Sequence, residues 1–299
     1  MDDAIYNKYK QAGAIAAAAR NYGAGLLKPR VSVLEVANQV ESMILKKGAG
    51  IAFPVNISID ERAAHFSPRN DDGLILKQGD VVKLDVGAHI DGYIADTATT
   101  VEVGTHNHSS MIKASNDALE KAIGLIRAGI DLSEIGEIVE KTIKSYGYKP
   151  ISNLTGHSLE QYQLHSGISV PSVSISRGKY KPKKGDVLAI EPFATDGEGR
   201  VISGEGSNIY LCNKSLRLKM ARDQRAKMSF KRLYAKFKTL PFAQRWCNDL
   251  LPGVDLTLKK LSFLGLIKQF PQLIEAKKGI VTQSEHTVII KEDGCEVTT

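Results

Sequence analysis

The chain carries Lys77-Gln-Gly-Asp-Val-Val-Lys-Leu-Asp85 and repeats this pattern, 106 residues later, as Lys183-Lys-Gly-Asp-Val-Leu-Ala-Ile-Glu191. Each copy predicts a short apolar strand that follows a Gly-Asp turn and ends at a carboxylate. An Asp-Gly turn is expected after each copy, at Asp91-Gly92 and at Asp196-Gly197. Because strand and terminal acid recur together, we interpret the chain as two related halves that face each other across a central cleft.

Composition narrows the class of protein. With 299 residues, 42% apolar and 24% charged, the chain is long enough to bury a large core. It has no uninterrupted apolar run near the roughly 18 residues of a membrane span. It starts Met1-Asp2-Asp3, and its three cysteines form no CxxC pair. These features argue against a secreted or membrane protein, so we expect a cytoplasmic one.

Positive charge is concentrated in one segment. Residues 204–270 hold 14 lysines and arginines against four acidic residues, in a chain whose net charge is +7. A helical pattern runs through this segment, and its expected apolar side carries Leu216, Met220, Met228, Leu233 and Phe237. Two interpretations stay open: a solvated helical face, or a surface that binds ribosomal RNA or another polyanion.

The first copy of the repeat opens a predicted hairpin. With Asp91-Gly92 as a two-residue turn, Gly87 lies opposite Asp96, and Asp85 is diagonal to Asp96 on the same face. Two carboxylates on a buried face repel each other unless a cation lies between them. On an exposed face the same pair would simply be solvated.

Other acids, and one histidine, stand in apolar or turn-like surroundings further along the chain. Four carboxylates and one imidazole make up the candidate set: Asp85, Asp96, His157, Glu191 and Glu285. Four negative charges would balance two divalent ions, and oxygen-rich ligation with one nitrogen suits Mn, Fe, Co, Zn or Ni rather than a thiolate site. The chain has no HExxH motif, so a helical zincin site is not expected.

The order of these motifs resembles the methionine aminopeptidases. An Asp and a second Asp eleven residues later are followed by Gly-His157, Ile-Glu191-Pro and Gln-x-Glu285-x-Thr. Residues 63–68, Ala-Ala-His-Phe-Ser-Pro, and the 94-residue interval between the two glutamates resemble the type 2 branch in its short archaeal form, although Phe66 and Ser67 replace the more usual Tyr and Thr. The resemblance implies an α/β (α+β) pita-bread fold, also used by prolidases and creatinase, with an internal pseudo-two-fold repeat. It implies a catalytic domain of residues 1–202 and 271–299 and an inserted basic helical subdomain of residues 203–270.

The resemblance also implies roles for individual residues. Two divalent ions would be held by Asp85, Asp96, His157, Glu191 and Glu285, and Glu191 would in addition move protons. His65 and His165 would contact the substrate without binding metal, and Phe53 and Leu164 would line the pocket for the methionine side chain. The implied activity is removal of the N-terminal methionine from peptides and nascent chains.

Alternatives from other classes remain. The same fold serves X-Pro aminopeptidases and dipeptidases, and a non-catalytic relative could bind ribosomes or RNA through the basic segment. The second alternative is disfavoured because all five candidate ligands are present. We expect a monomer without membrane contact, and a ribosome contact through the insertion is a further expectation.

Overall fold

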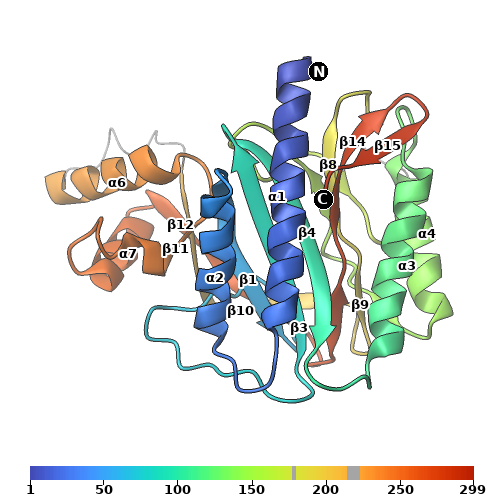
Figure 1. Cartoon of the computed structure of the whole chain (residues 1–299), viewed down its shortest axis with the longest axis horizontal. Helices are drawn as coiled ribbons and strands as arrows, with labels where there is room; N and C mark the ends of the chain where they lie inside the picture. Colours follow the sequence, from blue (N-terminus) through green and yellow to red (C-terminus); the bar gives the residue numbers. More distant parts are fainter. Residues whose placement is uncertain (177–179, 214–222) are drawn as a thin grey trace.

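A computed structural model describes residues 1–176, 180–213 and 223–299 (Figure 1). The first half of the chain packs two helices on one face of a three-stranded antiparallel sheet of order β1-β3-β4. Its elements are α1 (Asp3–Leu26), α2 (Val33–Lys46), β1 (Gly50–Ile59), β2 (Arg62–Ala64), β3 (Val81–Ile90) and β4 (Tyr93–Glu102). Figure 1 shows α1 and α2 lying side by side across these strands.

The helices of the first half form where the sequence predicts. Ser32 caps α2 by accepting a hydrogen bond from the Glu35 backbone N–H, which satisfies one of the free donors of the first turn. The apolar side of α2, including Val33, Val40 and Ile44, is fully buried against the sheet. This packing fixes the sheet that carries the first two candidate ligands.

The second half repeats this plan with a five-stranded sheet of order β15-β14-β8-β6-β7, covered by α3 and α4. Its elements are α3 (Ser109–Leu125), α4 (Leu132–Ser145), β6 (Gly156–Ser158), β7 (Ser169–Val170), β8 (Val187–Ile190), β14 (His286–Lys291) and β15 (Gly294–Val297). A small third sheet, β13-β9-β5, adds β5 (Lys149–Pro150), β9 (Phe193–Thr195) and β13 (Val281–Gln283).

The two copies of the repeated stretch have the same local structure. Gly79 and Gly185 both have φ of +92°, in the region that favours glycine. In the first turn the Asp80 carboxylate accepts a hydrogen bond from the Lys77 backbone N–H at 2.8 Å. In the second, the Asp186 carboxylate accepts one from the Lys183 N–H at the same distance. The strand that follows is β3 in one copy and β8 in the other. The predicted correspondence between the two strands is confirmed, but only Glu191 lies at a strand end. Because β3 continues to Ile90, Asp85 lies in the middle of its strand.

The second Asp-Gly pair does not form the expected hairpin. Asp196 and Gly197 follow β9, which belongs to a different sheet from β8, and Asp196 accepts a hydrogen bond from the Ile280 N–H at 2.8 Å. The chain leaves the sheet of β8 at Pro192, which has no N–H to donate to a ladder, so the hairpin cannot continue.

A separate helical layer lies at one end of the molecule, on the left of Figure 1. It contains β10 (Val201–Cys212), α6 (Gln224–Phe237), β11 (Phe242–Ala243), the 3₁₀ helix η1 (Gln244–Cys247), α7 (Val254–Phe263) and β12 (Ile267–Glu275). The sheet order β11-β10-β12-β2 joins this layer to the first half of the chain. The predicted boundaries at 202/203 and 270/271 fall inside β10 and β12.

The expected apolar side of the basic segment is partly wrong. Leu233 is fully buried, but Met228 is 58% exposed, and Phe230 takes its place in the core of this layer. Leu216 and Met220, with the basic residues Lys214, Arg217, Lys219 and Arg222, lie outside the described residues. Among the described helices, none combines the length and apolar character needed to cross a bilayer.

Candidate metal centre

The β3–β4 hairpin brings the first two candidate ligands together. Asp91 and Gly92 have φ of 51° and 87°, as a two-residue turn with both central residues left-handed requires. Gly87 pairs with Asp96 across the ladder, so the predicted register is confirmed. Asp85 therefore lies one diagonal step from Asp96, and both side chains face the same cavity.

The other three candidates arrive from the second half. His157 lies on β6, opposite Ala189 of β8, and Glu191 directly follows β8. Glu285 is the second of the two residues between β13 and β14, and its backbone pairs with Ala98 of β4. Backbone hydrogen bonds therefore join β4, β6, β8 and the segment before β14, which are far apart in sequence, on one side of the cavity.

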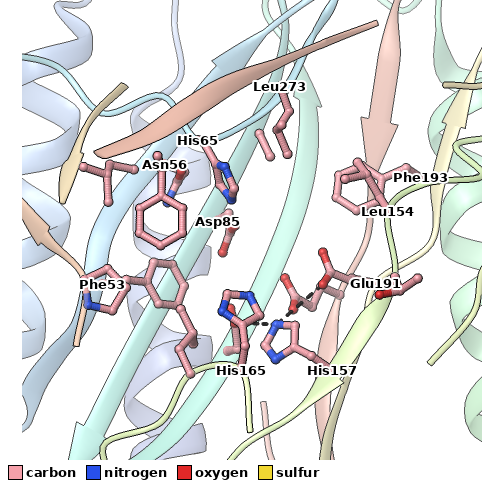
Figure 2. Close-up of a pocket in the computed structure, with 18 of the residues that line it drawn as sticks. Phe53, Asn56, His65, Asp85, Leu154, His157, His165, Glu191, Phe193 and Leu273 are labelled. Atoms are coloured by element: carbon pink, nitrogen blue, oxygen red, sulfur yellow. Dashed lines mark ion pairs between the residues drawn. The ribbon is translucent and has the colours of Figure 1, made fainter. Parts of the chain in front are cut away.

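Within this cavity the ligand atoms are close together. One oxygen each from Asp96 and Glu285 and one ring nitrogen of His157 lie within 4.8 Å of one another. His157 Nε2 is 3.6 Å from an Asp96 oxygen and 3.5 Å from a Glu191 oxygen, the two contacts dashed in Figure 2. Asp85 lines the same cavity, of about 250 Å³.

Electrostatics at the centre favour a bound cation. Burial raises the pKa of Asp85 to about 7, and burial together with neighbouring carboxylates raises the pKa of Asp96, Glu191 and Glu285 well above the usual range. Burial also lowers the pKa of His157 to about 3, which leaves its ring neutral and able to ligate.

Buried carboxylate oxygens that lack a hydrogen-bond partner also favour a bound cation. One oxygen each of Asp85, Asp96 and Glu285 is buried and has no hydrogen-bond partner among the described residues. Such atoms are costly to bury unless they bind something, and divalent ions with oxygen ligands are the natural occupants. The residues present fit a divalent metal centre.

Two histidines border the cavity from opposite sides. His65, with φ of 63°, points its ring inward, and its Nδ1 lies 3.2 Å from the Pro271 carbonyl oxygen. Burial lowers the pKa of His65 to about 4, so the ring is neutral near pH 7 and, with Nδ1–H donated to Pro271, Nε2 is a free acceptor. His165 lies with its ring centroid 4.3 Å from that of His157.

The predicted pocket residues also line this cavity. Phe53 packs directly over Gly87, where a Cβ would meet its ring at 2.2 Å, and Leu164 lies beside it in the same apolar cluster. All nine residues singled out in the sequence therefore line one cavity, and Figure 2 shows Phe53, His65, Asp85, His157, His165 and Glu191 around it.

Other lining residues escaped the sequence analysis. They are mostly apolar or amide side chains and include Asn56, Leu154, Phe193, Ile209, Pro241, Phe270 and Leu273. No motif marks them. Pro241 and Phe270 come from the helical layer, so that layer supplies part of the cavity wall.

Comparisons with known proteins agree with this geometry. The model of metallopeptidase family M24 matches residues 7–240. A methionine aminopeptidase of Methanocaldococcus jannaschii is 46% identical over 298 residues, covering 98% of each chain, and one of Pyrococcus abyssi is 43% identical over 295 residues, covering 98% of this chain and 99% of the relative.

Solved structures share the fold. The crystal structure of a methionine aminopeptidase from Thermotoga maritima aligns over 100% of this chain and 98% of that chain, with a TM-score of 0.73 and 22% identity. The pita-bread fold expected from the sequence is confirmed, as is the resemblance to methionine aminopeptidases. Since the family model covers more than half of the chain and the relatives span its full length, the chain belongs to metallopeptidase family M24.

Proposed function

We propose that this chain hydrolyses the first peptide bond of peptides and nascent proteins that begin with methionine, at a centre of two divalent ions. The proposed ligands are Asp85, Asp96, His157, Glu191 and Glu285. One observation carries the proposal: these five side chains, from β3, β4, β6 and the ends of β8 and β13, line a single cavity that contains unpartnered carboxylate oxygens. The full-length relatives named above point to the same activity.

Divalent ions held by these five side chains would polarise the scissile carbonyl and lower the pKa of a bound water towards neutrality. Glu191 is the proposed proton carrier, because its carboxylate opens onto the cavity, 3.5 Å from His157 Nε2. It takes a proton from the attacking water and returns it to the leaving amine.

The two histidines are assigned to the peptide itself. His65 is neutral at pH 7 and offers a free Nε2 to the scissile N–H, while His165, at the mouth of the cavity, hydrogen-bonds the carbonyl oxygen. Phe53 and Leu164 bound an apolar recess suited to an unbranched thioether side chain.

Finer features belong to the same proposal. We infer a short type 2 enzyme that works as a monomer in the cytosol, with residues 203–270 as an inserted subdomain. Support for the insertion comes from the separate apolar core formed by α6, η1 and α7. The exposed lysines and arginines of α6, among them Arg225, Lys231 and Arg232, support a contact with ribosomal RNA.

Metal content and peptide cleavage test the proposal together. Protein prepared without added metal is titrated with Mn²⁺ or Co²⁺, and bound ions are counted by mass spectrometry. We expect two ions in the wild type, fewer in Asp96→Asn and Glu285→Gln, and two in Asp117→Asn, a matched change at a carboxylate paired with Lys113 on α3.

The assay then compares Met-Ala-Ser with Ala-Pro and Gly-Pro peptides. Release of methionine from the first supports the proposal, and faster cleavage of the proline peptides would assign the chain to the X-Pro branch instead. Metal content equal to wild type in both ligand variants would contradict the ligand set. A salt-dependent ribosome pull-down, repeated with Lys227 and Lys231 changed to Gln, tests the contact separately.

A further inference from the structure

Two further cavities share lining residues with the catalytic cavity or with each other. An inner one, of about 220 Å³, shares Leu164, His165, Pro241 and Phe270 with the catalytic cavity. An outer one, of about 560 Å³, shares Tyr162 and Pro241 with the inner one. We call this succession from His165 to the outer cavity the exit groove.

The exit groove has the dimensions of an extended peptide. His165 is only three positions after Tyr162 in the chain, so their Cα atoms are at most about 11 Å apart. An extended chain advances about 3.3 Å per residue. A substrate whose first peptide bond lies beside His165 would therefore place its third to fifth residues along the inner cavity and up to Tyr162, where the outer cavity begins.

Lys238 stands at this point of the groove in a constrained position. It follows α6 with φ of 54° and ψ of −121°, an unusual conformation for a residue with a Cβ. Its Nζ lies 3.7 Å from the centroid of the Tyr162 ring, and the adjacent Thr239 hydroxyl donates to the Tyr162 carbonyl oxygen. The lysine charge is thereby fixed over the wall of the groove.

Charge along the groove is positive. Lys236 and Lys238 line the outer cavity, and Lys268 lies with its Nζ 5.3 Å from the centroid of Phe270, at the inner end. In the part of the chain that is described, none of these three lysines forms an ion pair with a carboxylate.

The carboxylates nearby are largely compensated. Asp91 pairs with Lys8 at 2.9 Å, and Glu41, in the wall of the outer cavity, pairs with Arg245. Glu160, which accepts a hydrogen bond from Gln163 at 3.3 Å, is the nearby acid without an ion-pair partner among the described residues. Three lysines against one such acid leave a surplus of positive charge.

We propose that the exit groove holds the substrate residues that follow the first peptide bond, and that Lys238 and Lys268 make it select peptides with an acidic side chain at positions three to five. This inference rests on the proposed function and extends it from the removed residue to the rest of the substrate. Complementary charge of this kind acts on association and on the choice of partner.

The test uses the full-length, Mn²⁺-loaded protein and matched pentapeptides, Met-Ala-Xaa-Ala-Ser and Met-Ala-Ala-Xaa-Ser, with Asp, Ala or Lys as Xaa. We expect kcat/KM for Asp to exceed that for Lys about fivefold at low salt, and the ratio to fall towards one at 0.5 M NaCl. In Lys238→Asn, which keeps a residue that tolerates the left-handed region, and in Lys268→Gln, the ratio should fall at least twofold. Lys238→Glu should reverse the preference.

Lys231→Gln is the control, because Lys231 is exposed on α6 and does not line the groove. It should keep the wild-type ratio, and a loss equal to that in Lys238→Asn would assign the effect to the general charge of the helical layer and overturn the proposal. Equal rates for Asp and Lys peptides in a wild type that releases methionine would also overturn it. If no peptide loses methionine at all, the proposed function itself has failed, which is a distinguishable result.

Discussion

The buried ion pair between Glu41 and Arg245 gives the sharpest stability prediction. Their side chains are 7% and 2% exposed, and an Arg245 nitrogen donates directly to Glu41. Glu41 also accepts from the Val55 N–H at 3.2 Å and from the Trp246 indole N–H at 2.9 Å. Arg245 donates to the Ser67 hydroxyl at 2.7 Å. The pair thus links α2 and η1 to the segments around Val55 and Ser67, and each of these two segments carries a residue that lines the cavity.

The magnitude follows from what each change leaves behind. Glu41→Leu leaves a buried guanidinium without its carboxylate, and Arg245→Met leaves the carboxylate without its cation, so each should lower the free energy of unfolding by about 3–5 kcal/mol. The double variant removes both charges. Its main remaining defect is the buried Val55 N–H, worth about 1–3 kcal/mol, because the Trp246 indole N–H, which also loses its acceptor, is only partly buried. The double change should therefore cost less than the two single changes together by at least about 2 kcal/mol.

Urea unfolding of the metal-free protein measures this coupling. Circular dichroism follows the whole chain, and fluorescence of Trp246, the single tryptophan, follows the pair itself. Coincident transitions are needed before free energies are compared. Single variants that each cost less than 1 kcal/mol, or a double variant equal to the sum of the singles within 0.5 kcal/mol, would refute the reasoning.

Three further outcomes are expected. In Gly87→Ala the new Cβ displaces the Phe53 ring, so kcat/KM for methionine peptides should fall at least about tenfold with metal content unchanged; an unaltered rate would contradict the pocket assignment. The Tyr6 hydroxyl and two lysines hold the pKa of Glu296 at about 2, below its usual value, so its contribution to stability is present above about pH 4.3 and fades as the pH falls towards 2. Glu296→Gln should thus lower the melting temperature at pH 7, by an amount below about 1 kcal/mol in free energy because the group is partly exposed, and should lower it clearly less at pH 2.5. His65→Ala should reduce turnover about 10²-fold with both ions retained, as ion counting will establish; loss of an ion would make His65 a ligand.

The hairpin and the repeated strands could be predicted because local rules determine them. An Asp-Gly turn fixes the register of both strands it joins, and side chains alternate with a period of two, so the relation between Asp85 and Asp96 follows from counting residues. The repeat and the order of the motifs predicted that residues from both halves would meet in one cavity. No local pattern would have predicted this.

Other features depend on packing that a single sequence does not reveal. Ala226, Phe230, Leu233 and Phe237 follow a helical spacing and form the buried side of α6, while Met228, two positions from Phe230, points about 200° away and is exposed. Pro241 and Phe270 reach the cavity only because the helical layer packs onto β2 and its neighbours. Long-range contacts of this kind leave no periodic signal.

The backbone bridge between Ala98 and Glu285 also has a consequence for biosynthesis. A chain still being translated already contains the β3–β4 hairpin, yet it lacks the strand that closes the floor until residues 281–291 have emerged. On the proposed ligand set, loading with metal must then wait until Glu285 has left the ribosome. Until then an unfinished copy has no complete metal centre, so on this proposal the order of synthesis itself delays the onset of its peptidase activity.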